Sequence, residues 1–280
     1  MTYASVMVHL DRSERAMHRL ELAIRYAQAH HARLIAVYAS FAPSPSWFYM
    51  MEGAARYIEE DRNRRNGVRD VVHEERFRDA TNALSLETEW RSVDGDPVAL
   101  VLREAREADL LIVGQRDPDD PESFVAADFV ETLILEAGRP VLVVPYAGRF
   151  TTVAQRLLVA WNGGRESARA LHDAVPLMQK ATVYVLQMID DHPHQRAEET
   201  TISQVARALL TYGIDSTVEE AHCVGSDVAI GEMLLSRAAD FNADLIVTGA
   251  YGHSRLRELV LGGVTRTLLN TMTVPVLMSH

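Results

Sequence analysis

Cysteine and lysine are almost absent from this chain of 280 residues, in which Cys223 and Lys180 are the sole residues of their kinds. A single cysteine excludes an internal disulfide and fits a reducing compartment. Long apolar runs are missing too, because segments such as "ADLLIVG" and "RPVLVVP" are far too short to span a bilayer. The N-terminus lacks a basic region followed by an apolar stretch and a cleavage site. We therefore expect a cytoplasmic protein with no membrane partner.

Positive charge is scarce as well, since the formal net charge is -11. Such a field disfavours broad binding to nucleic acid or to anionic membranes, so no nucleic-acid partner is expected. The chain is 48% hydrophobic and 24% charged, which is typical of a globular protein. A local basic pocket can still hold a small anion.

Two common nucleotide-binding motifs are also missing. A Walker A loop needs Gly-Lys-Ser/Thr, and the sequence contains no such triplet. No Gly-x-Gly-x-x-Gly follows the first apolar run of either half, because "NGGRES" at Asn162 is shorter and differently spaced. We predict no catalytic residues and no metal-ligating residues.

An internal repeat is the strongest feature that is present. An offset of 135 residues carries Ala108–Gly114, "ADLLIVG", onto Ala243–Gly249, "ADLIVTG", and it carries one "PVL" onto another. A second pair of matching segments opens the two halves, at Ser5 and at Arg156. The sequence therefore predicts a tandem duplication, with domains at residues 1–147 and 154–280.

Each half reads as alternating strands and helices. The predicted strands cover residues 5–10, 33–39, 86–91, 109–114 and 141–144, and then 157–161, 182–189, 216–223, 244–249 and 274–278. Buried strands separated by helices imply parallel sheets covered on both faces. We predict two tandem, doubly wound, five-stranded α/β domains of Rossmann-like type, related by a pseudo-twofold axis. The final strands are expected to pack across that axis, and ligands to bind beyond the carboxyl ends of the first and fourth strands.

Four glycines gather near the last helix of the second half, at positions 249, 252, 262 and 263. A helix N-terminus presents free N–H groups and favours anions, and glycine lets a phosphate approach the backbone. Residues 248–270 hold three arginines against one acid, whereas residues 113–135, their counterpart, hold one arginine against six acids. Of the four glycines, the first half keeps one, as Gly114. The comparison indicates a phosphate ligand in the second half and an empty or altered pocket in the first.

At this point the sequence resembles the universal stress proteins. Their nucleotide-binding members carry Gly-x-x-Gly, nine residues, and then Gly followed by Ser or Thr. Gly249, Gly252 and Gly262 match this spacing, and Gly263 takes the place of the Ser or Thr. Both halves share the resemblance, so the chain looks like a tandem member with an adenine nucleotide alpha hydrolase-like fold.

The resemblance implies ATP, with Mg²⁺, bound in the second half. The residues carried over are Ala160, Trp161, Asn162 and Met188 on the adenosine side, and Gly249, Tyr251, Gly252, Gly262, Gly263, Val264 and Thr265 on the phosphate and ribose side. Two residues depart from the family pattern. Asn162 replaces an acid that the first half keeps as Asp11, and Gly263 lacks the usual hydroxyl.

Three other functions fit the same sequence. The first is an ATP hydrolase or phosphotransferase that uses His253 and the arginines. The second is a nucleotide-free scaffold that acts through a protein partner docked on the first domain. Trp47 and Phe48 lie in an apolar stretch that fits a partner or membrane-facing patch, although packing against the other half is the preferred interpretation. A homodimer is also compatible with the sequence. The third is the binding of a non-phosphate ligand in the first-half pocket. We prefer a nucleotide-dependent regulatory or stress-response protein with at most slow hydrolysis.

Overall fold

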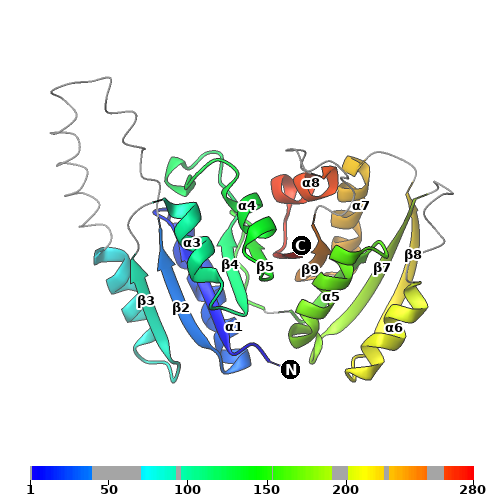
Figure 1. Ribbon diagram of the computed structural model, residues 1–280, viewed down its shortest axis with the longest axis horizontal. Helices are drawn as coiled ribbons and strands as arrows, with labels where there is room; N and C mark the ends of the chain where they lie inside the picture. The colour runs from blue at the N-terminus through cyan, green and yellow to red at the C-terminus, as the bar shows by residue number, and fades with distance from the viewer. Residues whose placement is uncertain are drawn as a thin grey trace.

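The computed structural model describes residues 2–39, 71–92, 96–152, 154–190, 201–223, 227–250 and 262–280. Strands and helices alternate within these ranges, as predicted (Figure 1). The strands are β1 (Ser5–Leu10), β2 (Arg33–Tyr38), β3 (Thr88–Ser92), β4 (Leu110–Gly114), β5 (Val141–Val144), β6 (Arg156–Trp161), β7 (Thr182–Asp190), β8 (Ser216–Cys223), β9 (Leu245–Gly249) and β10 (Val276–Ser279). The helices include α1 (Arg15–His30), α3 (Pro97–Ala105), α4 (Phe129–Glu136), α5 (Arg165–Met178), α6 (Ile202–Thr211), α7 (Asp227–Asp240) and α8 (Gly263–Thr271), and residues 71–81 are helical as well.

The strands form one ten-stranded sheet in the order β3-β2-β1-β4-β5-β10-β9-β6-β7-β8. Within each half the five strands are parallel and follow the same doubly wound order. The final strands meet antiparallel, with Leu142 opposite Leu277, so the predicted packing of these strands is confirmed. The two predicted five-stranded sheets are therefore joined edge to edge. Figure 1 shows the halves side by side, with β5 and the end of the chain between them.

A hydrophobic core lies on each face of this sheet. Successive residues of a strand point to opposite faces, so Val6 and Val8 pack with α1 while Met7 packs toward α3 and α4. The first core also takes in α5 and α6 of the second half, and the other core takes in α7 and α8. Each core thus runs through both halves, which fixes the halves relative to one another.

The sheet order determines where ligands can bind. β1 lies beside β4 and β6 lies beside β9, so the carboxyl ends of the first and fourth strands meet in each half, as predicted. The chain leaves these paired strands for helices on opposite faces, which opens a crevice between them. The candidate sites of the two halves are these two crevices.

Candidate functional site

The second-half site begins where β6 ends. Ala160 pairs with Thr248 of β9, and both Ala160 and Trp161 are buried. The chain then turns at Asn162, whose Oδ1 accepts a hydrogen bond from the Gly164 N–H at 3.0 Å. This amide oxygen therefore helps to hold the turn into α5, in the place where the sequence comparison expects an acid.

Gly249, at the end of β9, has a packing role. A Cβ atom on Gly249 would lie 2.5 Å from backbone atoms of both Glu166 and Ser167, at the start of α5. Gly114 occupies the same place in the first half, and a Cβ there would overlap the guanidinium of Arg19 in α1. Close packing of the first helix against the fourth strand thus requires glycine in the second half, and in the first half glycine leaves room for the Arg19 side chain.

Gly262 is placed differently, because a Cβ atom there would meet no atom of the described residues within 4 Å. Its φ of -53° is open to any residue, so neither packing nor backbone conformation requires glycine. It is the N-cap of α8, it makes no side-chain capping hydrogen bond, and the first turn contains no acid. Gly263 and Val264 are half-buried in that turn, and Thr265 is buried. The first turn of α8 therefore carries no acidic side chain of its own to balance the positive end of the helix.

Three of the predicted site residues have little or no description in the structure. Tyr251 and Gly252 lie outside the described residues, as do Trp47, Phe48 and His253. Met188 lies in β7, where its backbone is opposite Ala221 of β8. The remaining predicted residues come from the end of β6, the end of β9 and the first turn of α8.

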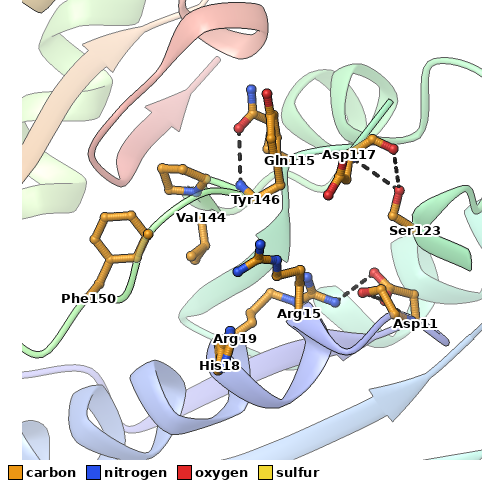
Figure 2. A pocket seen from close by; sticks show the side chains of 13 residues that line it. Asp11, Arg15, His18, Arg19, Gln115, Asp117, Ser123, Val144, Tyr146 and Phe150 are labelled. Atoms are coloured by element: carbon orange, nitrogen blue, oxygen red, sulfur yellow. Dashed lines mark hydrogen bonds and ion pairs between the residues drawn. The ribbon is translucent and has the colours of Figure 1, made fainter. Parts of the chain in front are cut away.

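The first-half crevice contains a buried ion pair that the sequence reading missed. Arg19 of α1 donates to the carboxylate of Asp11 at 2.8 Å (Figure 2). The Arg19 Nε also donates to the His9 carbonyl. The Ser13 N–H and hydroxyl also donate to Asp11. Burial alone would raise the pKa of Asp11, but Arg19, His9 and Ser13 outweigh it and hold that pKa below its usual value.

The acid kept in the first half is therefore bound by the protein's own cation. Aligning "SVMVHLDRSERAMHRL" with "RLLVAWNGGRESARAL" places Asp11 on Asn162 and Arg19 on Ala170. The charged pair of one half is thus replaced by a neutral pair in the other. This joint replacement of Asp11 and Arg19 by neutral residues is the sequence signal that could have indicated their contact.

Two more buried polar residues line the first-half crevice. His9 has its Nε2 2.7 Å from the Ala39 carbonyl oxygen, and burial lowers its pKa to about 4. Gln115 donates to the Leu269 carbonyl of α8 at 2.8 Å and accepts from the Tyr146 N–H at 3.2 Å (Figure 2). Gln115 thereby ties the end of β4 to a helix of the other half.

Within the described ranges, no group of three or more His, Cys, Asp or Glu side chains is arranged to hold a metal ion. A search of the same ranges for helices long and apolar enough to cross a membrane found none.

The fold and the two crevices define a tandem, doubly wound α/β protein. The sequence model of the Universal stress protein family matches residues 2–145 and again residues 154–280. The chain belongs to the universal stress protein family, in a tandem arrangement.

Two solved structures that cover almost the whole chain show the same fold. A universal stress protein from Archaeoglobus fulgidus is 16% identical, with 99% of this chain and 98% of that chain covered and a TM-score of 0.71. A protein of unknown function from Pseudomonas aeruginosa is 19% identical, with 99% and 92% covered and a TM-score of 0.57. A universal stress protein solved in complex with cAMP is 22% identical and covers 45% of this chain and 97% of its own, with a TM-score of 0.33. A search of curated proteins found no significant match.

Proposed function

We propose that the second half binds ATP, with Mg²⁺, and that the protein is a nucleotide-dependent regulator in a stress response rather than a fast enzyme. The observation that carries this proposal is the start of α8. It lies at the carboxyl edge of the sheet, has an N-cap glycine that packing does not require, and has no acid in its first turn.

The residues present fit a phosphate group. Open space beside Gly262 lets a phosphate approach the backbone N–H groups of the first helical turn. Arg266 lies exposed one turn into α8 and adds positive charge. The counterpart helix α4 instead has Asp128 as its N-cap and carries Glu131 in its first turn. The side chains at the two helix starts therefore differ in the sign of their charge, which is positive in the second half and negative in the first.

The proposed ligand would extend from α8 to the turn after β6. Ala160, Trp161, Asn162 and Met188 would contact the adenosine. The phosphates and ribose would be held by the remaining predicted residues, Gly249, Tyr251, Gly252, Gly262, Gly263, Val264 and Thr265. Magnesium would neutralise phosphate charge and bind mainly phosphate oxygens and water. We further propose that the two domains cover residues 1–147 and 154–280 and that the protein is cytoplasmic.

No general base or nucleophile enters this proposal, so we expect slow hydrolysis at most. The first experiment is to denature the purified protein and to identify the released small molecules by mass spectrometry. We expect an adenine nucleotide at up to one equivalent per chain. Arg266→Glu, which copies Glu131 of the first half, should lower this occupancy several-fold.

Arg207→Glu is the matched control, because it makes the same charge change on exposed α6. It should leave the occupancy unchanged. Protein that carries no nucleotide and does not bind added ATP would refute the proposal and favour the scaffold. Rapid ATP turnover by the pure protein would favour the hydrolase or phosphotransferase.

A further inference from the structure

The first half holds a cavity of about 350 Å³ in its own crevice. The cavity lies between the ends of β1 and β4 and the start of α4, and Leu269 and Asn270 of α8 complete its wall. Its volume is in the range that small-molecule sites occupy. It therefore has the size and place of a ligand site, and its chemistry differs from that of the second half.

We propose that this cavity binds a small organic cation, in which an ammonium group is attached to an aromatic or apolar body. The proposal concerns the first half and is independent of nucleotide binding in the second. Three observations support it: the charge of the wall, a buried hydrogen-bond acceptor, and aromatic side chains.

The charge of the wall is opposite to that of the second-half counterpart. The repeat places Asp128 on Gly263 and Glu131 on Arg266, and both acids line the cavity. Neither carboxylate makes a hydrogen bond or ion pair with any residue in the described ranges. A phosphate would be repelled here, whereas an ammonium group would find two carboxylates that no described residue pairs with.

The other charged groups of the wall offset these acids only in part, because, among the described residues, Arg116 is the one cation that the lining adds to the Asp11–Arg19 pair. Asp11 is already paired with Arg19, so that pair adds no net charge. Arg116 also lines the cavity, but its guanidinium lies over the Phe124 ring at 5.1 Å from the ring centre.

His9 supplies an acceptor within the cavity wall. It is only 1% exposed, and its Nε2 donates to the Ala39 carbonyl, so Nδ1 of the neutral ring is the acceptor. This Nδ1 has no hydrogen-bond partner among the described residues. Because burial lowers the pKa of His9 to about 4, the ring stays neutral near pH 7 and can accept a hydrogen bond from an ammonium group.

The remaining wall suits the body of such a ligand. Phe124 and Phe129 line the cavity together with Val125 and Val130. Phe129 is buried and packs against His9, with 4.8 Å between ring centres. Aromatic rings attract an ammonium group through their faces and also pack against an apolar body.

The test uses three ligands of similar shape that differ in charge: phenethylamine, phenethyl alcohol and phenylacetate. Isothermal titration on the full chain should show one equivalent of phenethylamine bound, weaker binding of the alcohol, and no binding of phenylacetate. Glu131→Gln should weaken phenethylamine about tenfold, because it removes a charged partner. The alcohol should be unaffected by this change.

Glu136→Gln is the matched control, since Glu136 is exposed at the other end of α4 and is not part of the cavity wall. It should leave phenethylamine binding unchanged. Failure of phenethylamine to bind at millimolar concentration would overturn the proposal. Equal binding of all three ligands, or equal loss in Glu131→Gln and Glu136→Gln, would also overturn it. Added ATP should not compete, and competition would place the amine in the second half.

Discussion

The guanidinium of Arg19 lies 2.8 Å from the carboxylate of Asp11, and the two side chains are only 3% and 7% exposed. Arg19→Ala would leave a buried carboxylate without its partner, so we expect a loss of about 3–5 kcal/mol in the free energy of unfolding. Urea denaturation near pH 7 measures this loss.

The second half supplies the control for this variant. Adding Asp11→Asn to Arg19→Ala reproduces the neutral residues Asn162 and Ala170 of the second half. We expect the double variant to recover much of the lost stability, because no buried charge remains. A double variant that is no more stable than Arg19→Ala would contradict this account of the pair.

His9 should make stability depend on pH. Burial lowers its pKa from 6.5 to about 4, so the unfolded chain takes up a proton more readily than the folded protein. The stability that the neutral ring contributes is complete above pH 6.5, and it is lost as the pH falls toward 4. The loss should be on the order of 3 kcal/mol across this window.

A pH series of urea denaturation on the wild type and on His9→Gln isolates this effect. The difference in unfolding free energy between the two proteins should shrink between pH 7 and pH 4.5. A difference that stays constant over this range would show that His9 is not held neutral by burial.

The glycines at 249 and 262 should respond in opposite ways to alanine. Gly249→Ala would place a Cβ 2.5 Å from the backbone of α5, so we expect a loss of several kcal/mol, in the range of overpacked cores. Gly262→Ala has open space and an ordinary φ, so thermal unfolding should change little. Equal effects of the two substitutions on the melting temperature would contradict the division into a packing glycine and an open one.

Gln115 should contribute to stability through its link between the halves. It is 8% exposed, and Gln115→Ala would leave the Leu269 carbonyl and the Tyr146 N–H without this partner. We expect a loss of about 1–3 kcal/mol. Gln28→Ala, at an exposed position of α1, is the control and should change stability by less than about 0.5 kcal/mol. Matching results for the two variants would argue against the link.

Much of the fold could be predicted because its signals repeat within the chain. The predicted strands agree with the observed ones to within about two residues at each end, and the "PVL" segments lie in the strands that join the halves. Local apolar patterns and an internal duplication were enough for this, since parallel strands read as continuous buried runs.

The sites were less predictable, because their key contacts join distant parts of the chain. A glycine required by packing, such as Gly249, reads the same in a sequence as Gly262, which faces open space. The sequence identified Asp11 only as the acid that the first half keeps after its first strand, and the structure shows that Arg19 is paired with it. Such pairings depend on where a helix crosses a strand, which local patterns do not specify.

The central claim is that the start of α8 holds phosphate. The most direct test measures the affinity of two variants, Gly262→Asp and Gly262→Asn, for ATP with Mg²⁺. Both side chains are favoured N-caps and enter open space, so both proteins should fold. They differ in one negative charge at the helix start. Isothermal titration should show at least tenfold weaker binding in Gly262→Asp than in Gly262→Asn. Equal affinity of the two variants, with the wild type binding no better, would contradict the account.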